Sequence, residues 1–165
     1  MNTSEKAKDI MKSMENLALQ PYDDQKGIKS APIKFWVKGA TIGWGHLIPQ
    51  SEWSTYKNGI SKQSADFLFE KDLRPFEIAV ERLVRRQLKQ YEFDALVMFT
   101  FNVGVGNFQT SSVLKMVNGE KGNYSTLEKA FLAFNKSQGK VMNGLTKRRQ
   151  LEYDLFNSGV YKNFQ

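Results

Sequence analysis

Carboxylates are the side chains of this sequence best suited to carry out chemistry. The chain has no cysteine and its one histidine is His46, which excludes thiol nucleophiles and makes a structural zinc site unexpected. Glu15 lies at the end of the first predicted helix, and Asp23 and Asp24 follow in a polar turn. One acid in an apolar setting and one in water differ in pKa, which suits a proton donor and a base. Thr41 offers a hydroxyl that can hold a water, although solvated surface charges are the alternative interpretation of these acids.

The elements that position these residues begin with an amphipathic helix. Thr3 or Ser4 can cap a helix over residues 4–17, whose apolar side chains follow the 3.6-residue period, and Pro21 is expected to end it. Up to residue 48, glycines and short β-leaning runs over 33–37 and 40–42 then replace the helical pattern. This pattern of glycines and short β-leaning runs predicts a small, hairpin-rich sheet.

The rest of the chain has the spacing of packed helices. Ser61 caps a helix that Pro75 is expected to break or kink. Residues 93–101 are apolar nearly all round, which predicts a core helix covered by neighbours on every side. A later helix is expected to begin at Ser111, and the final helix is expected to end at Gly159.

The predicted fold class is α+β. We expect one domain over residues 1–165, with a small sheet lobe over 18–60 and a helical lobe over 76–165 that includes the helix at 4–17. A connecting helix over 61–75 joins the lobes. Ligand sites often lie between two lobes, so a cleft is expected there.

A surplus of basic residues indicates a polyanionic partner. Lysine and arginine number 24 against 17 acids, a net charge of +7, and residues 136–165 carry 6 basic and 2 acidic side chains. An anionic membrane face, an acidic cell-wall polymer and nucleic acid all fit this charge, as does a merely solubilising surface. We expect no nucleic acid, because the aromatic residues follow core spacing and do not alternate with arginines. A basic binding module without catalysis is the alternative to an enzyme, with its cationic C-terminal region touching an anionic membrane.

The sequence has no signal for membrane insertion or export. No apolar stretch approaches the roughly 20 residues that span a bilayer. Residues 1–15 carry charges throughout, unlike the apolar core of a secretory signal. We therefore expect the chain to start in the cytoplasm.

Four blocks of sequence point to a family when they are taken together. The first is Glu15, eight residues and Asp24, followed by Thr-Ile-Gly-Trp-Gly-His-Leu over 41–47. The later blocks are Phe-Asn-Val-Gly over 101–104, the stretch 108–114, and Gly-Leu-Thr-Lys-Arg-Arg over 144–149. In this order they closely resemble the phage lysozymes of glycoside hydrolase family 24, over nearly the whole chain.

The resemblance implies a lysozyme-like fold and a bacteriolytic endolysin. Such a muramidase hydrolyses the β-1,4 bond between N-acetylmuramic acid and N-acetylglucosamine in bacterial peptidoglycan, without metal or cofactor. Glu15 would be the general acid, Asp24 the base that deprotonates a water, and Thr41 the hydroxyl that holds this water. The family inverts configuration, which requires space for the water between the carboxylates. The residues implied as substrate-binding are Leu47, Phe101, Asn102 and Ser111.

The resemblance also implies how the enzyme reaches its substrate. A monomer made in the host cytoplasm without a signal needs a lesion in the inner membrane, formed by a holin. It then acts on the peptidoglycan of the periplasm or cell wall and lyses the host.

The sequence departs from the family pattern between the two acidic blocks. Sixteen residues separate Asp24 from Thr41, whereas short members have about five, and the excess spans much of residues 28–38. We expect a longer hairpin or loop there. Its lysines and aromatic residues either extend the rim of the cleft and touch peptidoglycan or fold on their own lobe. Only Asp24, and not Asp23, has the eight-residue spacing from Glu15.

Other polar residues have both a structural and a functional interpretation. By the same matching, His46 is expected to pair with Asp72 on the connecting helix, which would raise the pKa of the histidine. Asn102 either bonds sugar or caps the core helix. The arginines at 148–149 either bond carbonyl groups or Glu152 on their own helix, or one of them reaches a catalytic carboxylate.

Overall fold

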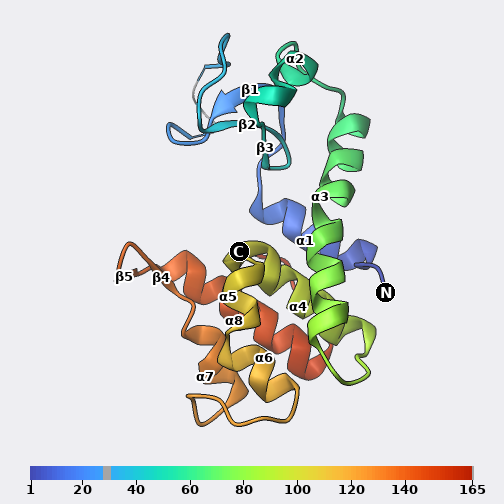
Figure 1. Ribbon diagram of the computed structural model, residues 1–165, viewed down its shortest axis with the longest axis vertical. Coiled ribbons are helices and arrows are strands. Elements are labelled where there is room, and N and C mark those ends of the chain that lie inside the picture. The colour runs from blue at the N-terminus through green and yellow to red at the C-terminus, as the bar shows by residue number, and fades with distance from the viewer. Residues whose placement is uncertain (28–30, 165) are drawn as a thin grey trace. The chain divides into compact units, whose positions relative to one another are not determined.

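The computed structural model describes residues 1–27 and 31–164 of an α+β protein, which confirms the predicted fold class (Figure 1). The chain divides into two units. The smaller contains residues 12–74, and the larger combines residues 1–11 with the chain from Pro75 onward. The chain passes from one unit to the other inside two helices, α1 (Glu5–Met14) and α3 (Lys62–Leu83).

The smaller unit is built on an antiparallel sheet of three strands in the order β1-β2-β3 (Figure 1). β1 (Ala18–Asp23) pairs with β2 (Ala40–Gly43), and β3 (His46–Leu47) pairs with the other edge of β2. A 3-10 turn (Gln50–Glu52) and α2 (Trp53–Tyr56) lead from the sheet to α3. The core of this unit is formed by Ala40, Ile42, Ile48 and Leu68.

The first helix is shorter than predicted. It is capped as expected, because the Ser4 hydroxyl accepts a hydrogen bond from the Ala7 N–H at 3.2 Å. It ends at Met14, however, and Pro21 lies inside β1 instead of ending a helix. The β1–β2 register is irregular between Ala18 and Tyr22, which is where a proline without an N–H interrupts the ladder least.

The inserted segment contains no strand at 33–37, so that prediction was wrong. Ile33, Trp36 and Val37 all pack against the core of the smaller unit, whereas a strand would point residues 36 and 37 to opposite faces. The Trp36 Nε1 donates to the Ile48 carbonyl at 2.8 Å and fastens the segment. This part of the insertion therefore folds on its own unit, while residues 28–30, with Lys29, lie outside the described residues.

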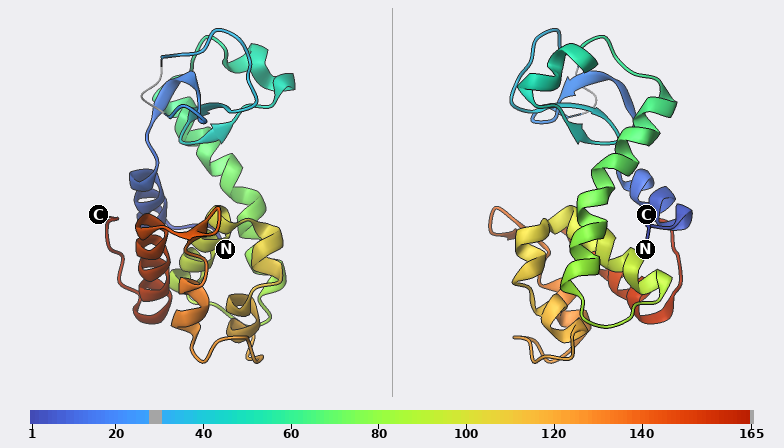
Figure 2. Two further views of the ribbon diagram at one scale, coloured as in Figure 1. Left: turned by 90° about the vertical axis from the view of Figure 1, so that its left-hand side faces the viewer. Right: turned by 45° about the vertical axis from the view of Figure 1, so that its right-hand side comes forward.

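The larger unit is a bundle around α4 (Gln90–Val103). Residues 93–100 are buried on every side of this helix, which confirms the predicted core helix. α4 packs mainly against α8 (Asn143–Ser158), and Figure 2 shows α8 in red among the other helices of the bundle. Those helices are α5 (Val105–Gln109), α6 (Ser112–Val117) and α7 (Leu127–Leu132).

α3 continues through Pro75 as one helix of 22 residues, so the predicted break was wrong (Figure 1). Ser61 caps it as predicted, because its hydroxyl accepts from the Ser64 N–H at 3.1 Å. Pro75 is exposed, which lets water satisfy the carbonyl group that the proline leaves without a donor. The apolar residues on either side of it, Leu73 and Ala79, are buried and hold both halves of the helix.

A small hairpin that the sequence analysis missed joins α7 to α8. Its strands are β4 (Lys136–Ser137) and β5 (Lys140–Val141), and Gln138 and Gly139 between them both have positive φ, as a two-residue hairpin turn requires. α8 ends where predicted, with Gly159 in the left-handed conformation. None of the helices in the described part of the chain has the length and apolarity needed to cross a bilayer.

The core of the bundle gives a test of the fold. Phe99 is fully buried, and its ring contacts those of Phe108, Phe131 and Phe134 edge-on at 5.1 to 6.2 Å. We expect Phe99→Ala to lower the free energy of unfolding in urea by about 3 to 5 kcal/mol, because it removes a packed ring and leaves a cavity. Phe67, which is 70% exposed, is the matched control. Phe67→Ala should change the free energy of unfolding by less than about 0.5 kcal/mol. Equal losses in the two variants would contradict this description of the core.

Candidate active site

Glu15 lies directly after α1, beside the turn between β2 and β3. Its backbone N–H donates to the Lys12 carbonyl at 3.1 Å, which extends the last turn of the helix. The residue is half-buried. A Cβ placed on Gly45 would lie 3.4 Å from the Glu15 Oε2, so the bare backbone of the turn forms one wall beside the carboxylate. Gly45 has φ +89°, a conformation that also favours glycine.

The two aspartates that follow have different environments. Asp23 is buried, and its Oδ1 accepts a hydrogen bond from the Gln25 N–H at 3.0 Å, as in an Asx turn. Asp24 is exposed, and its own N–H donates to the Gly39 carbonyl at 2.9 Å. The structure thus gives Asp23 a role in the turn and leaves the Asp24 carboxylate accessible to water.

Tyr22 links the two acids that the sequence analysis singled out. Burial raises the pKa of Tyr22, and the negative charges of Asp24 and Glu15 raise it further. Both carboxylates therefore lie close enough to act on one phenol group. Thr41 stands directly opposite Tyr22 in the β1–β2 ladder, so the structure brings Glu15, Asp24 and Thr41 into one neighbourhood of the smaller unit.

The Thr41 hydroxyl is oriented by the backbone. Thr41 is buried, and its Oγ1 donates to the Gly39 carbonyl at 2.9 Å. Because the hydroxyl proton is engaged, the oxygen presents its lone pairs as an acceptor. Sequence reasoning found Thr41 but missed Tyr22, although Tyr22 lies within the block from Glu15 to Asp24.

The residues expected to bind substrate are spread over both units. Leu47 belongs to the smaller unit and is 61% exposed. In the larger unit, Phe101 is half-buried against Phe76, with ring centroids 5.1 Å apart. Ser111 is buried, where its hydroxyl donates to the Phe108 carbonyl at 2.7 Å and caps α6 by accepting from the Leu114 N–H at 3.0 Å.

Asn102, the fourth of the residues expected to bind substrate, is exposed, and a buried arginine bonds its side chain. The buried Arg149 donates to its Oδ1 at 2.8 Å and, in a two-pronged pair, to the buried Glu152 at 2.7 and 2.9 Å. Burial raises the pKa of Glu152 to about 7, against the lowering effect of the Arg149 charge and hydrogen bonds. The sequence analysis left open whether the arginines at 148–149 bond Glu152 on their own helix or reach a catalytic carboxylate. Arg149 bonds Glu152. Its hydrogen bond to Asn102 fixes that amide with the oxygen inward.

The expected pair of His46 and Asp72 is confirmed. The His46 Nδ1 lies 2.8 Å from the Asp72 Oδ2, and the Nε2 lies 3.4 Å from the Glu52 Oε1. The hydrogen bond to Asp72 raises the pKa of His46 above its ordinary value, while burial opposes this and Glu52 adds to it. Glu52 is a partner that the sequence analysis did not find.

Comparison with known proteins decides the family. The pattern that defines phage lysozymes matches residues 12–152. The chain belongs to the phage lysozyme family. It is 37% identical to an endolysin of Bacillus phage B103 over 99% of its own length, and it spans 57% of that relative. The chain therefore covers less than two thirds of the length of this relative.

Solved structures of similar proteins share the fold of this family member. An endolysin from Escherichia coli O157:H7 phage FAHEc1 superimposes with a TM-score of 0.76 at 29% identity, covering 99% of this chain and 98% of that one. The muramidase domain of SpmX from Asticaccaulis excentricus gives 0.71 at 31% identity, covering 94% and 97%. The lysozyme-like fold expected from the resemblance is thus confirmed.

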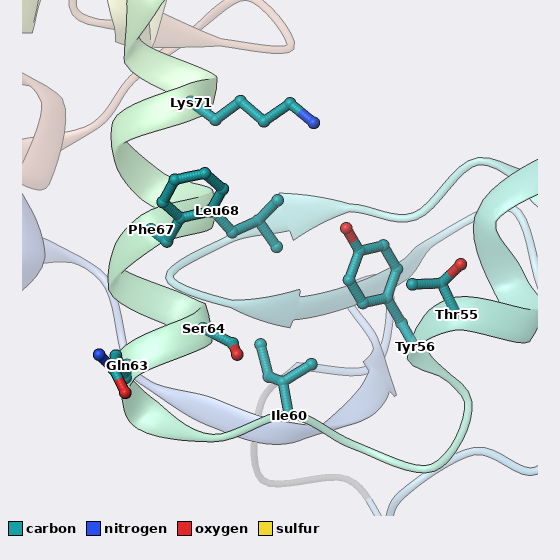
Figure 3. A pocket seen from close by; sticks show the side chains of 8 residues that line it. All are labelled: Thr55, Tyr56, Ile60, Gln63, Ser64, Phe67, Leu68 and Lys71. Carbon is teal, nitrogen blue, oxygen red and sulfur yellow. The ribbon is translucent and has the colours of Figure 1, made fainter.

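The smaller unit also has a pocket of about 580 Å3 between α2 and α3 (Figure 3). Its floor includes Ile60 and Leu68, and Figure 3 shows Phe67 and Lys71 projecting from α3 beside it. Neither Glu15, Asp24 nor Thr41 is among the residues that line this pocket. In residues 1–27 and 31–164, no three His, Asp or Glu side chains group in a way that could hold a metal ion.

The His46–Asp72 pair predicts a pH-dependent contribution to stability. We expect Asp72→Asn to lower the pKa of His46, measured by NMR titration, because it removes the main hydrogen bond that raises it. A histidine whose pKa is higher in the folded state than in the unfolded state stabilises the fold when it is protonated. This contribution to the free energy of unfolding is complete below the pKa of the unfolded state, near 6.5, and is lost as the pH rises through the pKa of the folded state. The stability difference between wild type and Asp72→Asn should therefore shrink from mildly acidic to alkaline pH.

A milder change in the same cluster serves as the control. Glu52→Gln should lower the His46 pKa less, because the contact is longer at 3.4 Å. An unchanged histidine titration in Asp72→Asn, or a stability difference independent of pH, would show that the two side chains are not coupled.

Proposed function

We propose that this chain is an endolysin that hydrolyses the β-1,4 bond between N-acetylmuramic acid and N-acetylglucosamine in bacterial peptidoglycan. Membership of the phage lysozyme family supports this proposal, as does the likeness to a protein described as a muramidase domain. The single observation that carries it is the gathering of Glu15, Asp24 and Thr41 around Tyr22. One half-buried acid, one hydrated acid and one oriented hydroxyl are what acid–base hydrolysis of a glycoside needs.

Glu15 acts as the general acid in this proposal. It is half-buried, and the backbone of Gly45 lies beside its carboxyl group. Its proton passes to the glycosidic oxygen as the bond to the anomeric carbon breaks. The leaving sugar thus departs as a neutral alcohol.

Asp24 and Thr41 act on the water. One hydrogen of the water is donated to the Asp24 carboxylate, and the other to the Thr41 oxygen, whose own proton is bound by the Gly39 carbonyl. With both hydrogens held, a lone pair of the water faces the anomeric carbon. As the new C–O bond forms, Asp24 takes the proton, and attack from the face opposite the leaving group inverts the configuration.

The substrate-binding residues are proposed on their exposure and chemistry. Leu47 offers an apolar surface in the smaller unit, and Phe101 offers a ring edge in the larger one. Asn102 has its oxygen bound by Arg149, so its NH2 group is the part left to donate to an acetamido carbonyl of the glycan. Ser111 acts indirectly, by fixing the start of α6.

Access to the wall and the choice of partners are further parts of the proposal. The enzyme starts in the host cytoplasm as a monomer, reaches the peptidoglycan through a lesion formed by a holin, and needs no metal or cofactor. The cationic C-terminal region, with exposed Lys136 and Lys140, contacts the anionic membrane face. Although Ile33, Trp36 and Val37 fold onto the smaller unit, Phe35 of the same segment is 81% exposed and is the aromatic side chain left to contact peptidoglycan.

The catalytic roles are tested by isosteric substitutions. Glu15→Gln should lower the rate of clearing of purified peptidoglycan by about 100- to 10,000-fold, because an amide of the same shape cannot deliver a proton. Asp24→Asn should be impaired to a similar degree. Asp23→Asn is the matched control next to it and should stay near wild type, because asparagine keeps the oxygen that binds the Gln25 N–H.

The outcomes separate an enzyme from a basic binding module. A chain that sediments with peptidoglycan but releases no reducing ends would favour the binding module. Near-wild-type clearing by Glu15→Gln would contradict the assignment, and a larger loss in Asp23→Asn than in Asp24→Asn would exchange the roles of the two aspartates.

A further inference from the structure

Asp66 joins two other elements of the smaller unit to α3. Its Oδ1 accepts hydrogen bonds from the Trp44 Nε1 at 2.8 Å and from the Lys12 Nζ at 3.0 Å, and its Oδ2 accepts from the Lys62 Nζ at 3.0 Å. Burial raises the pKa of Asp66, but these three hydrogen bonds and the charge of Lys12 outweigh it and lower the pKa to about 2. The carboxylate is therefore ionised in neutral and mildly acidic solution.

Lys12 ties this carboxylate to the chain segment that carries Glu15. The Lys12 carbonyl accepts the Glu15 N–H, so both residues belong to the same final turn. The Lys12 ammonium also lies 5.6 Å from the ring centroids of Trp44 and Phe69, which surround it with favourable contacts. A helix end has few backbone hydrogen bonds of its own, so this anchored side chain fixes the turn from which Glu15 projects.

Trp44 ties the same carboxylate to the wall beside Glu15. It stands between Gly43 and Gly45, which both have positive φ, in the turn that lies beside the Glu15 carboxylate. Two glycines make this turn intrinsically flexible. The hydrogen bond from the indole to Asp66 holds it in place.

We propose that Asp66 is a positioning residue for Glu15. One carboxylate fixes both the turn that carries Glu15 and the turn that lies beside its side chain. The inference rests on the proposed role of Glu15 as general acid. Positioning matters for catalysis because a displacement of about 1 Å can cost about 100-fold in rate.

Two variants remove the link at different points. Asp66→Ala should lower kcat on soluble peptidoglycan fragments by about 10-fold or more with KM within about twofold, because the displaced group acts in the transition state and not in substrate binding. Trp44→Phe keeps the ring but removes the N–H donor, and should lower kcat by a smaller factor. The double variant should be no slower than Asp66→Ala alone, because both changes break the same link.

Two controls separate positioning from stability and charge. Lys62→Gln removes a donor to the same carboxylate, but one on α3 itself, and should leave kcat unchanged. Glu92→Ala removes a similarly bonded carboxylate in the larger unit, which accepts from Arg86 and the Lys89 N–H, and should lower the melting midpoint without changing kcat well below it. Where Asp66→Ala fails to fold, Trp44→Phe and Lys12→Gln carry the test.

Wild-type kcat in the variants at Asp66, Trp44 and Lys12 would overturn the proposal. A loss in Lys62→Gln equal to that in Trp44→Phe would also overturn it, because the effect would then follow charge and not position. Glu15→Gln, measured alongside, keeps the two proposals apart. An active Glu15→Gln removes the proposed function, whereas an inactive Glu15→Gln with a fully active Asp66→Ala removes only the positioning role.

Discussion

The pairing of β1 with β2 is the constraint on which the candidate active site depends. Its register sets Tyr22 opposite Thr41, and the hydrogen bond from the Asp24 N–H to the Gly39 carbonyl extends the pairing beyond the last strand residue. Asp24 and Thr41, which are separated by sixteen residues of sequence, thereby lie on paired segments. The insertion is tolerated because the entropy of closing a loop grows only slowly with its length. The extra residues lengthen the connection without displacing its ends.

Once these strands are paired, close approach of backbone completes the site. Gly45, whose φ of +89° favours glycine, places the β2–β3 turn beside the Glu15 carboxylate. The ladder itself sorts the two aspartates, since Asp23 turns inward to cap the backbone and Asp24 stays in water. In the larger unit, two hydrogen bonds join the buried Arg149 and Glu152 beneath Asn102.

Local signals account for the parts of the structure that the sequence predicted. Ser61 and Ser111 cap their helices through contacts with residues three positions away, which a short stretch of sequence reveals. Residues 93–100 are buried on every side of their helix, which the nearly continuous run of apolar residues there reveals. The spacing from Glu15 to Asp24 and the His46–Asp72 pair came through the family resemblance, and the pair is confirmed. The roles of Glu15, Asp24 and Thr41 stay predictions.

Tertiary packing accounts for what the sequence analysis missed. Residues 33–37 look like a strand by composition, but three of their apolar side chains are drawn to the core from an irregular segment. Pro75 looks like a break, yet burial on both sides carries the helix across it. Asp66 also accepts hydrogen bonds from Lys12 and Trp44, which lie 54 and 22 residues away and which no local pattern connects to it. Such long-range polar contacts become visible only in the folded chain.

The configuration of the first product tests the account most directly, because it depends on a water held by Asp24 and Thr41 on the face opposite Glu15. Proton NMR during the first turnovers on peptidoglycan fragments resolves the two anomers of the new reducing end before they equilibrate. The account predicts the α-anomer from the β-linked substrate, as direct displacement by water requires. Initial formation of the β-anomer would mean that a covalent intermediate precedes the water, and would contradict the roles given to Asp24 and Thr41.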